Sequence, residues 1–349
     1  MNNVMKRILA FAAALVLLWS FAAADEELIV EEETEEAAAA AESADEAVTE
    51  KDGWHFNAKG FLVGENPGEE YLLEDEENGV WQYASRDLSI RITRVREKLK
   101  KPKKTREYCV AEVYASESSP LFSISTEATE KRIAGYNKLK PADLVKDNPV
   151  MLAISDDYYG HRLQTKNAGK AKWPVGIIIR NGTILGDTTR TGKKVEFPPL
   201  DTLAVYADGS MKADPVAAKT AEEFLAEGAA QVFAFGPWLI SDGVINEKGV
   251  DSGDKTYMYN TGRYTDSRAA IGMVEPYHYI AIVVKGRPKD KYNGVKFDWL
   301  AEKMLELGCV EALNLDGGGT ACIYFNGKEI IRGDKAVRAL GSMIAFGQQ

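Results

Sequence analysis

The stretch that decides the fold reads Asn314-Leu315-Asp316-Gly317-Gly318-Gly319-Thr320. It follows directly on a segment at residues 310–315 that is predicted to be a strand. Three successive glycines weaken any regular element, so the chain is expected to turn sharply where this strand ends. A turn of this kind exposes backbone N–H groups that can cradle an anion such as phosphate, and Asp316 would lie beside them. The alternative is a plain sharp turn; a nucleotide-binding P-loop is not indicated, because no lysine follows the glycines.

Short strands separated by glycine and asparagine turns are predicted on both sides of this stretch. They are expected at residues 80–83, 88–92, 110–114, 150–154, 175–179, 203–206, 232–235, 279–284 and 322–325. Two helices are expected, at residues 221–227 behind a Thr220–Glu223 capping box and at residues 297–305 before Gly308. The pattern predicts the α+β class: a mixed, strand-rich sheet with few helices, preceded by a small β-rich accessory region.

The first 52 residues differ from the rest of the chain. In residues 1–24, Lys6 and Arg7 precede an apolar run and three alanines, which is the pattern of a secretory signal peptide. The run is shorter than the roughly 20 residues of a comfortable membrane span, so cleavage is expected rather than an anchor. Residues 25–52 hold 13 acidic residues and one basic residue, and are expected to be an acidic low-complexity spacer. We therefore expect a secreted or cell-envelope protein with no stable membrane span after cleavage.

Charge and cysteine content narrow the function classes. The 349-residue chain has 43 Lys and Arg against 53 Asp and Glu, and the acidic spacer accounts for the imbalance. A neutral body does not favour nucleic-acid binding, and the basic run at residues 96–106 is interpreted as a hairpin tip. Cys109, Cys309 and Cys322 are expected to be lone buried thiols, with a Cys309–Cys322 pairing as the alternative. Residues 53–149 are assigned to the β-rich N-terminal region and residues 150–349 to the main domain.

Three further motifs could carry chemistry. Trp238 precedes Asp242-Gly243 and offers an aromatic wall for a sugar ring, or else it is a core residue. Arg268 and Arg287 flank apolar strands. Their guanidinium groups can bind a phosphate or carboxylate group through paired hydrogen bonds; the alternative is that they form structural ion pairs or lie at solvated strand ends. Asp156 and Asp157 follow the end of another predicted strand. Two adjacent carboxylates there can serve in acid–base catalysis or bind a metal ion; the alternative is that they form a solvated acidic turn. A Ser-His-Asp hydrolase has no Gly-x-Ser-x-Gly motif to support it.

Taken together and in this order, the motifs resemble the phosphodiester glycosidase family, which includes the lysosomal-pathway uncovering enzyme and many exported bacterial homologues. The resemblance runs from about residue 150 to the C-terminus and also covers residues 175–182. The family usually has serine after the glycines, where this chain has Thr320 and so keeps the hydroxyl group. The first motif of the family usually contains Asn-Gly and aromatic residues. In this chain the corresponding segment reads Ser155-Asp156-Asp157-Tyr158-Tyr159.

The resemblance implies an exported hydrolase that cleaves the glycosidic C–O bond of a sugar-1-phosphodiester. Asp316 is then expected to be the base or nucleophile, with Asp157 or Asp242 as partner carboxylate. The expected substrate-binding residues are Trp238, Arg268, Arg287, Asn314, Gly317, Gly318, Gly319 and Thr320, and the partner is a glycan or sugar phosphate. No cofactor is required by the sequence. Two alternatives stay open: a non-catalytic cell-wall or polysaccharide binder, favoured by the altered early motif, and a Ca²⁺-dependent structural protein using the adjacent aspartates and the acidic spacer.

Overall fold

The computed structural model describes residues 48–127, 138–157, 176–188, 200–215, 218–251, 264–287, 291–335 and 337–348. Apart from Val48, these residues belong to one compact unit, Thr49–Gln349. The expected signal peptide and residues 25–47 of the expected spacer lie outside the described residues. The end of that spacer forms β1 (Thr49–Lys51), which pairs with β2 (Trp54–Phe56), so this part is a short strand.

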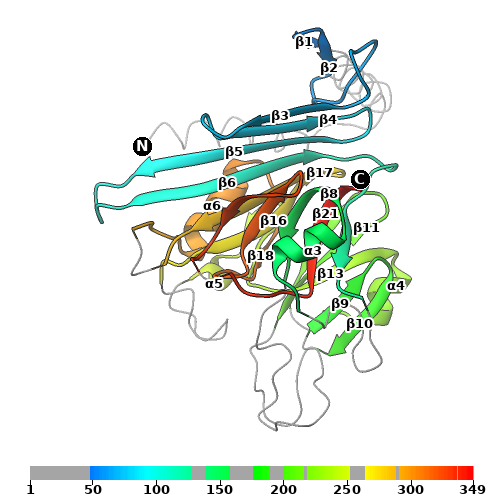
Figure 1. Cartoon of the computed structure of the whole chain (residues 1–349). Helices are drawn as coiled ribbons and strands as arrows, with labels where there is room; N and C mark the ends of the chain where they lie inside the picture. The colour runs from blue at the N-terminus through cyan, green and yellow to red at the C-terminus, as the bar shows by residue number, and fades with distance from the viewer. Residues whose placement is uncertain are drawn as a thin grey trace, which may run out of the picture. The chain divides into compact units, whose positions relative to one another are not determined.

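A nine-stranded antiparallel sheet is the largest element of the unit (Figure 1). Its strand order is β15-β14-β18-β16-β17-β6-β5-β4-β3. The bounds are β3 (Tyr71–Asp75), β4 (Val80–Ala84), β5 (Ser89–Lys98), β6 (Thr105–Tyr114), β14 (Trp238–Ser241), β15 (Val244–Ile245), β16 (Arg268–Glu275), β17 (His278–Lys285) and β18 (Glu311–Leu315).

Two five-stranded sheets pack beneath it. One has the order β10-β9-β13-β11-β12 and the other β20-β19-β8-β21-β7. The bounds of the first are β9 (Gly176–Arg180), β10 (Thr183–Thr188), β11 (Asp201–Tyr206), β12 (Met211–Asp214) and β13 (Ala229–Phe235). Those of the second are β7 (Phe122–Ser125), β8 (Val150–Ser155), β19 (Cys322–Phe325), β20 (Lys328–Arg332) and β21 (Ser342–Gln348). All of these ladders are antiparallel, so strand direction is more uniform than in the mixed sheet that was expected.

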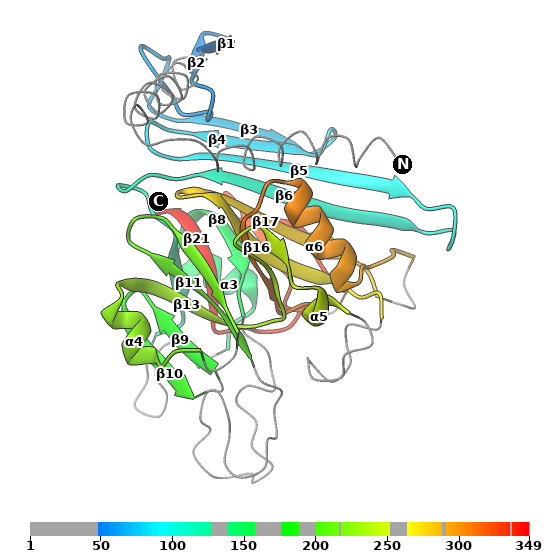
Figure 2. The same cartoon turned by 180° about the vertical axis from the view of Figure 1, so that it is seen from behind.

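Short helices cover the outer faces of the sheets. They are α3 (Pro141–Asp147), α4 (Ala221–Ala226), α5 (Glu247–Val250) and α6 (Phe297–Glu306). The capping box of α4 is present as predicted, with the Thr220 side chain accepting from the Glu223 N–H and the Glu223 carboxylate accepting from the Thr220 N–H. Figure 2 shows α6 against the large sheet, where it packs on β14, β16 and β18. The prediction of a strand-rich α+β fold with few helices is thus confirmed. No helix of the described part is long and apolar enough to span a membrane.

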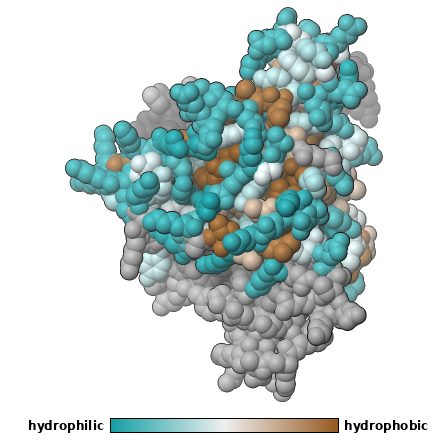
Figure 3. Space-filling view, viewed as in Figure 1, coloured by the Kyte–Doolittle hydropathy of each residue, from teal (hydrophilic) through white to brown (hydrophobic). Residues whose placement is uncertain are grey.

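Alternation along the strands builds two cores, one on each face of the large sheet. On β17, Tyr279, Ala281 and Val283 face the core shared with the five-stranded sheets, while Ile280 and Ile282 face α6. A period of two is what a sheet covered on both faces requires. The three cysteines are buried and free, as expected for lone thiols. The coloured part of the face shown in Figure 3 is mostly hydrophilic, with apolar residues between the hydrophilic ones near its centre.

The N-terminal region is part of the same sheet as the glycine-rich stretch. β6 pairs with β17 along all of β17, from His278 opposite Tyr114 to Lys285 opposite Glu107. The predicted tip at residues 96–106 is the end of the β5–β6 hairpin, in which residues 99–104 form the turn and the residues on either side are paired in the strands. Residues 53–149 therefore contribute strands to the sheet that carries the candidate site.

Candidate functional site

A pocket of about 190 Å³ opens where β18 ends in the glycine turn. Its lining comes from segments far apart in the chain: Phe235, Asp266, Ser267, Arg268, Arg287, Phe297, Asn314, Leu315, Asp316, Gly317, Gly318 and Arg338. Six of the eleven predicted site residues are brought together here, namely Arg268, Arg287, Asn314, Asp316, Gly317 and Gly318. The other five lie outside the lining.

The glycine turn fixes the position of Asp316, the first residue after the end of β18. Asp316 is 8% exposed, and the Thr320 hydroxyl lies 2.5 Å from its Oδ2 atom and 2.8 Å from the Gly317 carbonyl oxygen. Thr320 does not line the pocket, so its predicted contact with substrate is replaced by a contact with Asp316. The hydroxyl at this position therefore orients the carboxylate.

Close packing explains two of the three glycines. A Cβ on Gly317 would lie 2.4 Å from the Ser267 carbonyl oxygen, and Gly318 has a φ of +70°, which non-glycine residues rarely adopt. The Gly318 N–H donates to Ser267 Oγ at 2.7 Å, so it is already engaged within the protein. Gly319 lies outside the lining, where its carbonyl accepts from the Arg338 N–H. The Gly318 N–H is therefore not available to the expected anion cradle. The close approach at Gly317 and the positive φ of Gly318 are what the turn requires of these two glycines.

Arg268 begins β16 at the floor of the pocket. It is 6% exposed, donates to the carbonyl oxygens of Val295 and Tyr264, and lies 4.1 Å from the centre of the Phe297 ring. Burial lowers its pKa to about 10, against the opposing effect of Asp266. The group therefore stays cationic at neutral pH, in surroundings of low dielectric where its attraction for an anion is strong.

Arg287 and Arg338 complete a cluster of three arginines. Arg287 Nε lies 2.7 Å from Asp334 Oδ2, and its Nη1 lies 3.8 Å from Asp266 Oδ2. Arg338 lines the same pocket and was not predicted, because it lies in an irregular segment with no motif around it. Three arginines and two aspartates, Asp266 and Asp316, line the pocket, and Asp334 pairs with Arg287 from outside the lining. Guanidinium groups bind phosphate and carboxylate groups through paired hydrogen bonds, so the pocket suits an anion such as a phosphate ester.

Asn314 is held at the pocket wall by the turn between β13 and β14. Its Nδ2 atom donates to the Gly236 carbonyl oxygen at 2.8 Å, which fixes the orientation of the amide. The Oδ1 atom is buried without a hydrogen-bond partner within the described residues. An acceptor of this kind at a pocket wall suits a hydroxyl or N–H group of a ligand.

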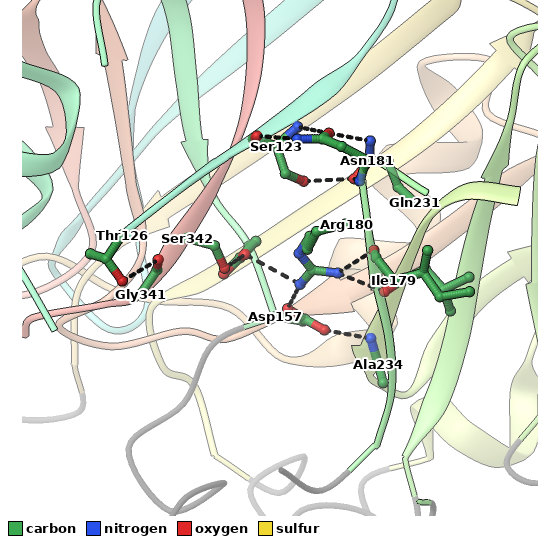
Figure 4. A network of polar contacts seen from close by, with 12 residues as sticks. Ser123, Thr126, Asp157, Ile179, Arg180, Asn181, Gln231, Ala234, Gly341 and Ser342 are labelled. Atoms are coloured by element: carbon green, nitrogen blue, oxygen red, sulfur yellow. Dashed lines mark hydrogen bonds and ion pairs between the residues drawn. The ribbon is translucent and has the colours of Figure 1, made fainter. Parts of the chain in front are cut away.

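Asp157 belongs to a buried ion-pair network rather than to the pocket (Figure 4). It is 0% exposed, forms an ion pair with Arg180, and accepts the Ala234 N–H at 2.5 Å. Asp156 contacts the same arginine at 3.3 Å, and its carbonyl oxygen accepts from the Asp316 N–H at 3.4 Å. Asp157 was expected to be the partner carboxylate of Asp316, but its carboxylate is taken up by the ion pair with Arg180 and does not line the pocket. Asp156 and Asp157 instead support the glycine turn, through the hydrogen bond between Asp156 and Asp316.

Asp242 lies at the opposite end of β18 from Asp316. Its side chain is 83% exposed and pairs with Lys212, while its N–H donates to Glu311, the first residue of β18. Asp316 lies five positions after Glu311 along the strand, about 17 Å at a rise of about 3.4 Å per residue. The prediction that Asp242 partners Asp316 is therefore wrong.

Trp238 is a partly buried core residue. It packs against the main core, and its N–H donates to Asp201 Oδ2 at 2.9 Å. It does not line the pocket, so the core interpretation of this tryptophan is the one that the geometry supports. The described residues contain no group of three or more metal-ligating side chains of the His, Cys, Asp and Glu types.

Comparisons with known proteins show which sequences and folds this chain resembles. The model of the phosphodiester glycosidase family matches residues 148–347. The chain is 27% identical over 159 residues to an uncharacterized protein derived from the SPbeta prophage of Bacillus subtilis (strain 168), YomE. That match covers 45% of this chain and 22% of the relative, so the chain spans about a fifth of the relative's length.

Two solved structures share the fold. The catalytic domain of zebrafish N-acetylglucosamine-1-phosphodiester alpha-N-acetylglucosaminidase, auto-inhibited by its pro-peptide, matches with a TM-score of 0.53 at 15% identity, over 80% of this chain and 88% of that one. A hypothetical protein from Synechocystis matches with a TM-score of 0.53 at 13% identity, over 77% of this chain and 64% of that one. Because the family model spans more than half of the chain, this protein belongs to the phosphodiester glycosidase family.

Proposed function

We propose that this protein hydrolyses the glycosidic C–O bond of a sugar-1-phosphodiester and releases a free sugar and a phosphate monoester. The observation that carries the proposal is one pocket in which Asp316 lies among Arg268, Arg287 and Arg338. The family is one of glycosidases, and its zebrafish member is named for an N-acetylglucosamine-1-phosphodiester.

The chemistry follows from the charges in the pocket. When the anomeric C–O bond breaks, negative charge develops on the phosphate oxygen that leaves. Guanidinium groups that already line the pocket stabilise that charge, and electrostatic stabilisation of this kind is usually the largest single contribution to catalysis. A phosphate monoester leaves readily, so strong help from a general acid is less necessary.

Asp316 is the base or nucleophile in this proposal. It reaches the pocket from the end of a rigid strand, and Thr320 fixes its orientation. The other carboxylate in the lining is Asp266, which takes the partner role that sequence reasoning gave to Asp157 or Asp242. The separation of the two carboxylates in a substrate complex would report the stereochemistry: about 5–5.5 Å for retention and roughly 6.5–9.5 Å for inversion.

The test is incubation of the full chain with methyl diesters of glucose 1-phosphate and N-acetylglucosamine 1-phosphate, with reducing sugar as the readout. Release of sugar by the wild-type protein, lost in Asp316→Asn, supports the proposal. Binding of a diester without any release would favour instead a non-catalytic glycan binder.

Export to the cell surface or the medium is part of the proposal, and rests on the signal-like pattern of residues 1–24. Mass spectrometry of the mature protein from its producing cell is the measurement. A mature N-terminus near residue 25 supports export, and an intact N-terminus in the cytoplasmic fraction contradicts it.

A further inference from the structure

The hairpin formed by β5 and β6 extends past the other strands of the large sheet (Figures 1 and 2). The ladder between β4 and β5 ends at Thr93, and the ladder between β17 and β6 ends at Glu107. Beyond these positions β5 and β6 continue to pair with each other as far as Lys98. The Leu99 N–H donates to the Lys104 carbonyl oxygen at 2.9 Å and closes the turn, so the tip of the hairpin has a defined shape.

The end of this hairpin carries a concentrated positive charge that the mechanism above does not use. Residues 96–106 hold seven basic residues and one acidic residue, whereas residues 53–349 as a whole are balanced in charge. Arg96 and Arg106 are paired with glutamates of the same hairpin. Four exposed lysines form no ion pair within the described residues: Lys98, Lys100, Lys101 and Lys103. Their charges together create a local positive potential that attracts anions.

Protection of a strand edge does not account for these charges. Lysine is common on exposed strand edges, where it prevents pairing with other chains. Lys100, Lys101 and Lys103 lie in the turn at residues 99–104, outside both strands. Their positions therefore favour the binding of an anionic partner.

The base of the hairpin is joined to the arginine pocket by a short segment. The Asn293 N–H donates to the Thr105 carbonyl oxygen at 2.8 Å, and two residues later the Val295 N–H donates to the Asp266 carbonyl oxygen at 2.9 Å. Asp266 lines the pocket. At about 3.4 Å per residue, this route places the lysines of the tip within about 30 Å of the pocket. The tip is therefore attached to the wall of the pocket rather than to a distant part of the protein.

The side chains at the tip indicate a partner with repeated phosphate charges. Lysine is a compact, hydrated point charge that binds phosphate without a fixed geometry. Residues 96–106 contain no aromatic side chain on which nucleic-acid bases could stack. The one leucine of this run, Leu99, is half-buried, so it is not free to enter a membrane. The tip therefore suits negative charges that are spaced along a flexible chain.

A polymer can reach both basic sites, whereas a small diester reaches only the pocket. In a chain of sugars or polyols joined by phosphodiesters, one phosphate can contact the tip while another lies in the arginine pocket. Binding at the tip then raises the effective concentration of the polymer at the pocket, with no new contact in the pocket itself.

We propose that the tip of the β5–β6 hairpin, residues 98–103, is an exosite that captures a polymer of phosphodiester-linked sugars or polyols and holds it near the arginine pocket. The choice of polymer rests on the proposed function, whereas its binding at the tip requires no turnover. The hairpin lies outside residues 148–347, so the exosite belongs to the N-terminal region and not to the part of the chain that the family model matches.

The experiment measures binding of the full chain to poly(glycerol phosphate), which repeats the phosphodiester charge but has no glycosidic bond to cleave. In the triple variant Lys100→Gln, Lys101→Gln, Lys103→Gln the affinity should fall about tenfold at low salt, because each exposed ion pair changes an affinity by a factor of about 1.4 to 5. Each lost phosphate contact lowers the slope of log affinity against log salt by about 0.7–0.9, so the slope should fall by about two. The matched control removes three exposed lysines from other elements and should bind as the wild-type protein does: Lys140→Gln, Lys146→Gln and Lys328→Gln.

Cleavage of a sugar 1-phosphate methyl diester separates the exosite from the proposed function. The tip variant should cleave this small diester within about twofold of the wild-type rate, because charges that far from the pocket are screened by salt. If the wild-type protein does not cleave it, the proposed function fails, and the binding assay still decides on the exosite.

Three results of the binding assay would overturn the exosite: no binding of the polymer by the wild-type protein, unchanged binding in the tip variant, or an equal loss in the control variant. Binding to phosphatidylglycerol vesicles that depends on the tip, while binding of the polymer does not, would assign the tip to a membrane surface and overturn the exosite as well.

Discussion

Gly318 offers a sharp test of the arginine cluster, because a methyl group added at this position would overlap with the side chain of Arg287. A Cβ on Gly318 would lie 2.3 Å from Arg287 Nη2 and 3.5 Å from Arg338 Nη2. In Gly318→Ala the flexible guanidinium group of Arg287 must move away, since the backbone of the turn is fixed by Ser267. Alanine at a φ of +70° also costs about 1–2 kcal/mol of backbone strain.

The expected result separates stability from binding. Displacing Arg287 removes one charge-assisted hydrogen bond to a bound phosphate, worth about 1.5–3 kcal/mol, so affinity for inorganic phosphate should fall about 10- to 150-fold. The matched control is Gly327→Ala, where φ is +74° but no atom lies within 4 Å of the new Cβ. The control should lose similar stability and keep its phosphate affinity.

The assay is calorimetric titration of each variant with phosphate, with urea unfolding to measure stability. The reasoning about the cluster is refuted if Gly318→Ala binds phosphate as tightly as the wild-type protein does. It is refuted equally if Gly327→Ala loses as much affinity as Gly318→Ala.

Three further changes probe the site and its support. Asp316→Asn should reduce turnover of a sugar-1-phosphate methyl diester by about 10²–10⁴-fold and leave the melting temperature within a few degrees; a smaller loss of turnover removes Asp316 from the mechanism. Asp157→Asn breaks a fully buried ion pair and should lower the free energy of unfolding by about 3–5 kcal/mol, whereas the exposed Asp242→Asn should change it by less than about 1 kcal/mol; equal effects in denaturant titrations would contradict the structure. Burial alone would raise the pKa of Glu107, but two basic partners outweigh it and hold that pKa below its usual range. A lowered pKa stabilises the fold above the unfolded value of about 4.3, so the stability gap between wild type and Glu107→Gln should shrink as pH falls below that value; a gap that widens there would show the sign to be wrong.

Local signals were enough to predict most of the elements. The α4 capping box needs only Thr220 and Glu223, three positions apart, and the strand at Glu311–Leu315 needs only its own residues and the glycines that end it. Alternation and turn residues act over a few positions, so they can be recognised in a single sequence. The order of the strands within each sheet was not predicted, because it depends on contacts between distant segments.

The candidate site was predicted only where a motif marked it. Asp316 was found because the glycines beside it are unusual, and Arg268 because a charge at the start of an apolar strand is costly. Asp157 looked equally promising, but its partner Arg180 comes from a different strand, and nothing local reveals that pairing. Arg338 has no motif around it, so only the folded chain places it in the pocket.

The continuous ladder between β6 and β17 has a practical consequence for anyone who shortens this protein. A fragment trimmed to the family match, residues 148–347, would strip β17 of its neighbour and leave a row of unpaired backbone groups on a long apolar strand. Edges of that kind recruit other chains, so the trimmed protein is expected to aggregate during expression. A soluble truncation should instead retain the first four strands of the large sheet and start ahead of Tyr71.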